Sequence, residues 1–275
     1  MDARTARRPG LLPMDPGDWT LGGEGEAAEL AERDALMAGR LDAVWAETEG
    51  SRPAQAEARD ALLAHLATRP DYAVEGTRAT RPDGVTVETA DGPPLLVAGR
   101  CVREDLCLME RGSQERGPRE YVLTAAVLCF PSRWRLAEKI GRPLTAIHAP
   151  VPTYDDDLAR RVNRIFEGLR AGRPLWRANV TVHDSDALHQ PEAAPPEGDR
   201  LWVRVERQTF VRLPRTGAVV FGIRTLQRPL EALAPAEAAG LRAYLAGHGA
   251  AEVAYHAGGA ALHARALARL AAVAA

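Results

Sequence analysis

The sequence predicts an α+β fold in which an antiparallel sheet is enclosed by helices. Three observations lead to this prediction: helical periodicity before residue 70, short apolar runs between residues 94 and 130, and a hairpin pattern over 201–226 followed by a helical C-terminus. Strands grouped between helical segments are typical of the α+β class. A chain of 275 residues can bury a sizeable core within one domain.

The N-terminal part of the chain combines an irregular segment with two helices. Residues 1 to about 25 are rich in proline, glycine and charge, and we expect them to lie extended over the body, anchored by Trp19. Helical periodicity then predicts helices over 27–44 and 54–67.

The middle of the chain changes to short apolar runs. The runs at 94–98, 106–109 and 121–130 predict strands of a half-buried antiparallel sheet. The periodic segment 154–169 predicts a helix with the acidic triplet 155–157 at its N-terminal end. Since acidic side chains stabilise the positive end of a helix dipole, we interpret the triplet as part of the helix start rather than as a metal site.

The last third of the chain contains the strongest hairpin pattern. Strands are predicted over 201–213 and 218–226 after a loop over 190–199, and helices over 235–246 and 260–273 follow. We divide the chain into an N-terminal extended and helical wrap (1–50), a main domain (51–230), and C-terminal helices packed on the same domain (231–275).

Composition and charge narrow the function classes. The formal net charge of −2 offers no overall basic field, so we expect no nucleic acid and no anionic membrane as partners. Three cysteines without CxxC spacing support neither a disulfide framework nor a zinc or iron–sulfur site within the chain. No run approaches the roughly 20 apolar residues of a membrane span, and we expect a cytoplasmic protein.

The segment 128–152 combines four prolines with one histidine. Because the prolines interrupt any long helix, we expect His148 to lie in a stiff loop among apolar neighbours, where it is a candidate axial ligand of a metal. A core histidine hydrogen-bonded to the backbone is the alternative. The remaining histidines show no metal-type spacing: we interpret His65 as a packed or half-exposed helix residue, His183 and His189 as surface residues, and His248, His256 and His263 as solvated residues.

The hairpin places two arginines opposite each other. A turn over 214–217 pairs Leu213 with Ala218, and this register sets Arg207 opposite Arg224 on an otherwise apolar face. Like charges across a sheet need an anionic partner, which is either a carboxylate of a bound ligand or an internal acid. The candidate internal acids are Glu32, Glu104, Glu138 or another acidic residue.

Several motifs, in their order and spacing, resemble the haem-dependent oxidative N-demethylase family. They are REDLCL at 103–108, CFPSRW at 129–134 with EKIG at 138–141, IHAPVP at 147–152, RAN at 177–179, RVERQT at 204–209, RLP at 212–214 and FGIRT at 221–225. The resemblance covers roughly residues 100 to 230. One departure is Val180, since the family usually has tryptophan after RAN.

The resemblance implies a PAS-like antiparallel sheet with flanking helices that enclose a haem b pocket. It implies oxidative N-demethylation of a small secondary amine by a haem-dependent monooxygenase that uses O₂. The electrons would come from NADPH through partner subunits that carry flavin and an iron–sulfur centre, and this chain would be the haem subunit. A non-catalytic haem PAS-type gas sensor and a haemless protein that binds a small acidic ligand are the alternatives.

Within this resemblance, cofactor-binding roles are expected for four residues. His148 is the expected proximal ligand of the haem iron, and Arg133 and Lys139 are expected to bind haem propionates, with a solvent-facing helix end as the alternative. Gly222 lacks a side chain and would let the flat cofactor approach the sheet. Cys129 is interpreted as a buried inert thiol rather than an iron ligand.

Catalytic roles are expected for three residues on the arginine-bearing face of the hairpin. Arg224 or Arg207 would polarise the bound oxygen molecule, with Thr209 beside them on the same face.

Overall fold

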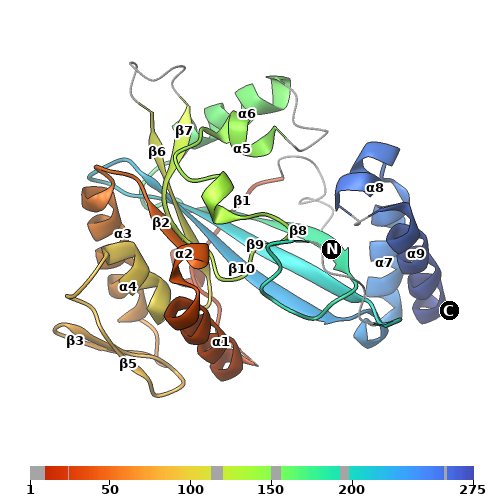
Figure 1. Ribbon diagram of the computed structural model, residues 1–275, viewed down its shortest axis with the longest axis horizontal. Helices are drawn as coiled ribbons and strands as arrows, with labels where there is room; N and C mark the ends of the chain where they lie inside the picture. The colour runs from red at the N-terminus through yellow and green to blue at the C-terminus, as the bar shows by residue number, and fades with distance from the viewer. Residues whose placement is uncertain (1–9, 24, 113–119, 150–155, 193–197, 257–258) are drawn as a thin grey trace.

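A seven-stranded antiparallel sheet forms the centre of the molecule (Figure 1). The computed structural model describes residues 10–23, 25–112, 120–149, 156–192, 198–256 and 259–275. The strand order is β1-β8-β9-β10-β6-β7-β2, so the predicted α+β class is confirmed. The strands are β1 (Leu12–Pro13), β2 (Trp45–Glu47), β6 (Asp105–Arg111), β7 (Tyr121–Val127), β8 (Leu175–His183), β9 (Trp202–Arg212) and β10 (Val219–Pro229).

Helices cover the sheet on both faces. On one face α3 and α4 pack at one end of the long strands and α7 and α9 at the other, whereas α5 and α6 pack on the opposite face. The helices are α1 (Glu26–Gly39), α2 (Leu41–Val44), α3 (Arg52–Leu66), α4 (Pro94–Cys101), α5 (Leu144–His148), α6 (Asp156–Gly168), α7 (Pro235–Ala246), α8 (Ala250–His256) and α9 (Ala260–Ala274), with short 3₁₀ turns η1 (Pro16–Asp18), η3 (Leu136–Glu138) and η4 (Leu230–Ala232).

The predicted long helices and the hairpin are confirmed. α1 with α2, α3, α6, α7 and α9 occupy the expected segments, and their apolar sides face the core. The hairpin has the predicted register: the Leu213 amide donates to the Ala218 carbonyl at 2.8 Å, and Arg207 lies opposite Arg224. Gly217 closes the turn with a φ of 71°, a left-handed conformation that favours glycine.

The prediction of a strand over 94–98 is wrong, because these residues begin α4. Pro94 lies in the first turn of that helix, where its missing amide hydrogen is tolerated. Leu95 to Ala98 are all buried, so the run is apolar on every side of the helix and shows no helical periodicity.

Several further elements were not predicted, among them β1 and β2, the two edge strands of the large sheet. β8 carries polar residues at every second position, and this alternation was obscured by the polar residues that follow it. The short helix α8 lies between α7 and α9. A separate small sheet consists of β3 (Ala73–Glu75), β4 (Arg78–Thr80) and β5 (Thr86–Glu88).

The N-terminal segment crosses the sheet as expected, within the described residues 10–23. Met14 and Trp19 are buried in the same core cluster as α3 and α4.

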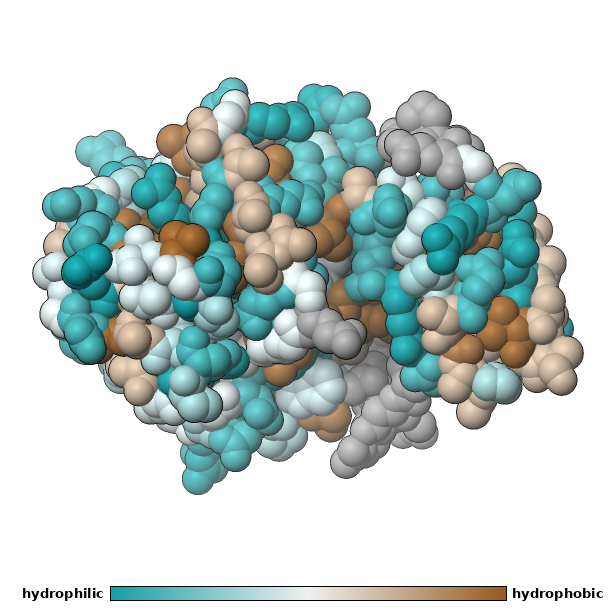
Figure 2. All heavy atoms as spheres, turned by 90° about the horizontal axis from the view of Figure 1, so that it is seen from below, coloured by the Kyte–Doolittle hydropathy of each residue, from teal (hydrophilic) through white to brown (hydrophobic). Residues whose placement is uncertain are grey.

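Exposed large apolar side chains are scattered among polar ones on the surface. Figure 2 shows a hollow between the main body and the C-terminal helices on the side viewed from below. Among the described residues, no helix has the length and apolar character needed to cross a bilayer.

Candidate functional site

The three long strands β8, β9 and β10 present two chemically different faces. Residues directly opposite each other in an antiparallel sheet share a face, and successive residues alternate between faces. One face, here called the arginine face, carries Arg207, Arg224, Thr209 and Gly222. The other, here called the polar face, carries Arg177, Asn179, Glu206 and Gln208.

On the arginine face, Arg207 binds the N-terminal segment. Its guanidinium donates to the carbonyl oxygens of Asp18 (2.5 Å) and Trp19 (3.4 Å), and it lies 3.0 Å from the sulfur of Met14. The guanidinium carbon also lies 5.7 Å from the ring centroid of Trp176. The charge of Arg207 is therefore held by backbone carbonyls and an aromatic face of the protein itself.

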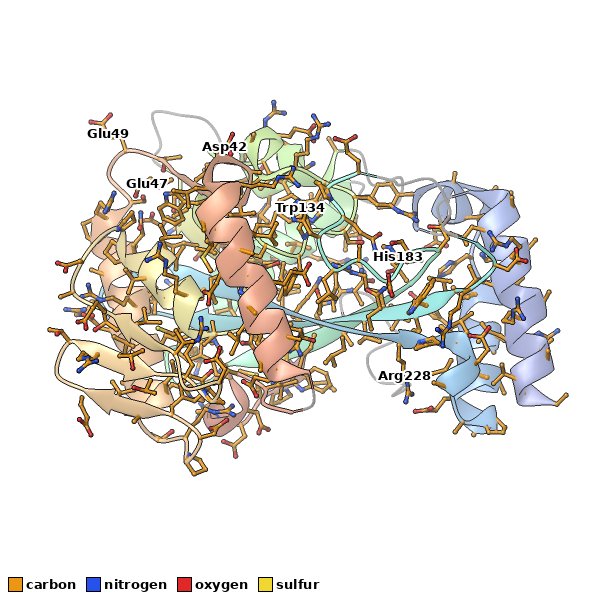
Figure 3. The ribbon with its side chains drawn as sticks, turned by 60° about the horizontal axis from the view of Figure 1, so that its bottom comes forward. Asp42, Glu47, Glu49, Trp134, His183 and Arg228 are labelled. Atoms are coloured by element: carbon orange, nitrogen blue, oxygen red, sulfur yellow. The ribbon has the colours of Figure 1, made fainter. Side chains whose placement is uncertain are left out.

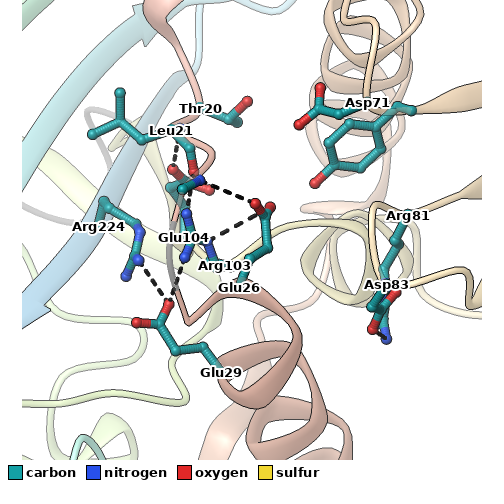
Figure 4. Close-up of polar contacts among 12 residues, drawn as sticks. Thr20, Leu21, Glu26, Glu29, Asp71, Arg81, Asp83, Arg103, Glu104 and Arg224 are labelled. Atoms are coloured by element: carbon teal, nitrogen blue, oxygen red, sulfur yellow. Dashed lines mark hydrogen bonds and ion pairs between the residues drawn. The ribbon is translucent and has the colours of Figure 1, made fainter.

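Arg224 is paired with an acidic residue of α1. Its guanidinium lies 2.6 Å from Oε2 of Glu29, and the same oxygen accepts from Arg103 at 3.1 Å (Figure 4). β6 pairs with β10 only as far as Ile223, so Arg224 reaches α1 beyond the end of β6. Of the two partners left open by the sequence, the structure contains an internal acid, and that acid is Glu29.

A second acid near this pair holds the N-terminal segment. Glu104 is buried, and its carboxylate accepts a hydrogen bond from the Leu21 amide at 2.9 Å. Burial raises the pKa of Glu104, while the charges of Arg224 and Arg103 oppose that rise. Arg103 donates to the Leu21 carbonyl at 2.9 Å, so both backbone groups of one residue are bound by adjacent charged side chains.

The space beside Gly222 is occupied by Thr209. A Cβ atom on Gly222 would lie 2.6 Å from Thr209 Oγ1, so the glycine makes room for the hydroxyl of its cross-strand neighbour. Thr209 Oγ1 is buried and has no hydrogen-bond partner among the described residues. Protein groups therefore surround Arg207, Arg224, Thr209 and Gly222 on this face, whereas the polar face is partly exposed.

His148 is the last residue of α5, so the expectation of a loop at this position is wrong. Pro143 immediately precedes α5 and permits a single short helical turn before the next prolines. His148 Nδ1 lies 2.8 Å from the carbonyl oxygen of Leu144. Since a carbonyl only accepts, Nδ1 carries the proton and Nε2 carries the lone pair.

The surroundings of His148 lower the pKa of its imidazole and so favour the neutral form. Burial lowers its pKa, and the positive charges of Lys139 and Arg177 lower it further against the opposing effect of the Leu144 hydrogen bond. Lys139 Nζ donates to the carbonyl oxygen of Ile147 at 2.7 Å, and this hydrogen bond stabilises the C-terminal end of α5. Arg177, whose charge acts on His148, lies on the polar face of β8.

The polar face is partly exposed around Arg177. Arg177, Asn179, Glu206 and Gln208 are all half-buried, in contrast to the buried residues of the arginine face. Gln208 donates to Glu206 at 3.2 Å. Arg177, Asn179 and Gln208 were not selected as site residues from the sequence, although the RAN motif contains the first two.

Arg133 combines an unusual backbone with unsatisfied donors. Its φ of 60° is in the left-handed region, which a non-glycine residue adopts at an energetic cost. Its amide donates to the Gln190 carbonyl at 2.6 Å, and its Nη2 lies 3.9 Å from Asp184. The buried Nε and Nη1 atoms have no hydrogen-bond partner among the described residues, so the guanidinium has capacity for an anion.

The interpretation of His183 as a surface residue is wrong, because its exposed fraction is only 1%. Figure 3 shows its position within the molecule. It lies at the end of β8 beneath the loop that follows, and its ring bonds to Gln190 Oε1 (2.7 Å) and Thr181 Oγ1 (3.0 Å). Burial lowers its pKa to about 3, with a further contribution from Arg204. Both ring nitrogens are engaged, so His183 is a structural residue.

Two other sequence interpretations concern buried or packed side chains. Cys129 is buried, and burial raises the pKa of its thiol to about 11, which confirms the inert-thiol interpretation. His65 is half-buried on α3 and bonds to Thr20 Oγ1 at 3.0 Å, which confirms its interpretation as a packed helix residue. His189, also half-buried, bonds through Nδ1 to the Cys129 carbonyl at 2.8 Å.

Fold and site together define a mixed α+β protein that presents one neutral histidine beside a polar sheet face. A family model described as haem-dependent oxidative N-demethylase, alpha subunit-like, matches residues 10–256. The chain therefore belongs to the haem-dependent oxidative N-demethylase alpha subunit-like family. The predicted family resemblance is confirmed, and the family description implies haem and a multi-subunit enzyme.

The residues of the candidate site are suited to haem. His148 has the tautomer of an Nε2 ligand, with the Nδ1 hydrogen bond to a carbonyl that accompanies metal-ligating histidines. Arg133 offers buried guanidinium donors that suit a carboxylate such as a propionate. Among the described residues no cluster of three or more metal-ligating side chains forms, but haem iron requires only an axial ligand from the protein.

Proposed function

We propose that this chain is the haem subunit of an oxidative N-demethylase acting on a small secondary amine, with His148 as the axial ligand. The observation that carries the proposal is the 2.8 Å contact between His148 Nδ1 and the Leu144 carbonyl, which orients the ring and directs the Nε2 lone pair away from the helix backbone. In this proposal the α+β body is a PAS-like fold around a haem b pocket.

The protein's own groups would position the cofactor. Arg133 would bind a propionate through Nε and Nη1, whereas Lys139 would hold the end of α5, and with it His148, by its bond to Ile147. Arg177 and Asn179 would supply hydrogen-bond donors on the polar face beside His148. Bound haem would supply the activation of O₂, using electrons from NADPH delivered by partner proteins with flavin and iron–sulfur centres.

Haemin titration of wild-type protein and of His148→Ala tests the ligand assignment. The wild type should develop the Soret band of a histidine-ligated b-type haem, and His148→Ala should lose or strongly shift it. His65→Ala is the matched control, because His65 is also a half-buried helical histidine held by a hydrogen bond. Its spectrum should equal that of the wild type. Unchanged ferric and ferrous spectra in His148→Ala would remove His148 from the ligand role.

Turnover with a reductase tests the activity. Loaded protein supplied with NADPH, the electron-transfer partners and a secondary amine should release formaldehyde. Stable haem and O₂ binding without formaldehyde would indicate the gas-sensor alternative instead.

A further inference from the structure

Exposed arginines gather on the C-terminal part of α6 and on the turn that leads into β8. Residues 160–173 contain five arginines and a single acidic residue, Glu167, so this segment has a formal charge of +4 in a chain whose net charge is −2. All five arginines are exposed. They form what is here called the basic surface: Arg160, Arg161, Arg164, Arg170 and Arg173.

Ion pairs neutralise only part of the basic surface. Asp157 pairs with Arg160 at 3.5 Å and with Arg161. Glu167 pairs at 3.0 Å with Arg111 of β6, which lies outside the basic surface. Within the part of the chain that the structure describes, three arginines of the basic surface therefore have no ion-pair partner: Arg164, Arg170 and Arg173.

A tight turn sets two of these arginines opposite each other. Arg170 and Arg173 form an antiparallel bridge, and the Arg173 amide donates to the Arg170 carbonyl at 3.1 Å. Gly172 lies inside the turn with a φ of 73°, a left-handed conformation that favours glycine. Like charges at opposed positions of an antiparallel pair repel each other, so an anionic partner from outside the chain would relieve this repulsion.

The basic surface lies close to the candidate site. Phe166 of α6 packs in the same core cluster as Leu144 and Ile147 of α5, the helix that ends at His148, and α5 and α6 lie side by side in Figure 1. Arg173 precedes Arg177, whose charge acts on His148, by four residues, which span at most about 14 Å. A protein bound to the basic surface would therefore lie near a haem held by His148.

We propose that the basic surface docks the electron-transfer partner of this chain, and that the partner presents acidic side chains to Arg164, Arg170 and Arg173. This inference rests on the proposed function, because the chain needs electrons only if it holds haem. The family description implies a multi-subunit enzyme. Opposite charges on two proteins speed their association and orient them, and salt screens this effect. Proximity to His148 favours a redox protein over an anionic membrane as the occupant.

Stopped-flow reduction of the haemin-loaded protein by a reduced, acidic plant-type ferredoxin tests the proposal. The second-order rate for the wild type should fall at least about 10-fold between about 0.01 M and about 1 M salt, because the Debye length shortens from about 30 Å to about 3 Å. The double variant Arg170→Glu, Arg173→Glu should lose about 10- to 100-fold of the low-salt rate and most of the salt dependence. Arg170→Gln with Arg173→Gln should fall between the two, and it serves if the charge-reversed protein does not fold.

The matched control is the double variant Arg200→Glu, Arg242→Glu. It makes the same change in net charge with two exposed arginines at the other end of the long strands, since Arg242 lies on α7 and Arg200 precedes the end of β9 that pairs with His183. Its rates and their salt dependence should equal those of the wild type. A loss of rate as large as that of Arg170→Glu with Arg173→Glu would show that net charge, and not the basic surface, governs the encounter.

The remaining outcomes separate the docking assignment from the proposed function. Equal rates in the wild type and in Arg170→Glu with Arg173→Glu, with dithionite reducing the haem in both, would overturn the docking assignment alone. Failure of the wild type to load haemin would overturn the proposed function and the docking assignment with it. Sedimentation with phosphatidylserine vesicles of the wild type but not of the double variant would assign the basic surface to a membrane and overturn the proposal.

Discussion

The two faces of β8, β9 and β10 hold charged residues in opposite ways. On the arginine face, Arg207 and Arg224 are 9% and 1% exposed, and Glu29 and backbone carbonyls of the N-terminal segment bind them. On the polar face, Glu206 is half-buried between uncharged cross-strand neighbours. Buried charges with protein partners stabilise the fold, whereas the half-buried charges of the polar face contribute less to it.

The largest expected effect comes from removing the acid of the arginine face. Glu29→Ala leaves Arg103 and Arg224 buried without their shared carboxylate, so the free energy of unfolding should fall by about 3–5 kcal/mol in urea denaturation. The control is Glu167→Ala, which breaks the exposed pair with Arg111 and should cost less than about 1 kcal/mol. Equal losses in the two variants would show that the arginines do not depend on Glu29.

A second contrast compares one arginine from each face. Arg207→Leu removes the donors to the Asp18 and Trp19 carbonyls and should lower stability by about 2–3 kcal/mol, with faster proteolysis near the N-terminus. Arg177→Leu should change stability by less than about 1 kcal/mol, because the residue is only half-buried, and should alter the visible spectrum of haemin-loaded protein. If Arg177→Leu lowered the free energy of unfolding more than Arg207→Leu, the charged residues of the polar face, not those of the arginine face, would stabilise the fold.

The buried end of the polar face should show a pH dependence. His183 has a folded-state pKa of about 3 against 6.5 in the unfolded chain, so between these values the unfolded state binds the proton and stability falls as pH falls. The loss should approach about 1.4 kcal/mol per pH unit below pH 6.5. His183→Gln should flatten this slope between pH 6.5 and 5 in urea denaturation, and an unchanged slope would place His183 in a solvated environment.

The smallest expected effect concerns Thr209. Thr209→Val replaces a buried hydroxyl that has no partner among the described residues, so stability should change by less than about 1 kcal/mol, in the stabilising direction. Haem loading and formaldehyde release should match the wild type. Loss of turnover with haem retained would instead support the catalytic role expected for Thr209 from the sequence.

Local patterns along the chain were sufficient for much of the fold. The register of the hairpin followed from its turn and from the alternation of apolar residues, and it placed Arg207 opposite Arg224 as found. α3 and α6 followed from helical periodicity. The run at 94–98 failed, because a short fully buried helix and a short buried strand have the same composition.

The candidate site was predictable only in part. His148 stood out because it is the one histidine among closely spaced prolines, but its hydrogen bond to Leu144 depends on the helical turn of α5. His183 was misread because its polar neighbours suggest a surface, whereas the loop after β8 folds back over it. Whether a polar residue is buried depends on segments distant in the sequence. The local sequence pattern contains no information about those segments.

The sequence by itself determined the α+β class, the family, the strand pairing of β9 with β10, and the presence of two opposed arginines. Only the tertiary structure decided which side of the sheet is filled by protein. Hairpin register assigns residues to faces, but it does not say what covers each face. The N-terminal segment and α1 cover the arginine face through contacts with Arg207 and Arg224 that are distant in the sequence. On the polar face, α5 and α6 pack near Phe210, whereas Arg177, Asn179, Glu206 and Gln208 remain half-buried.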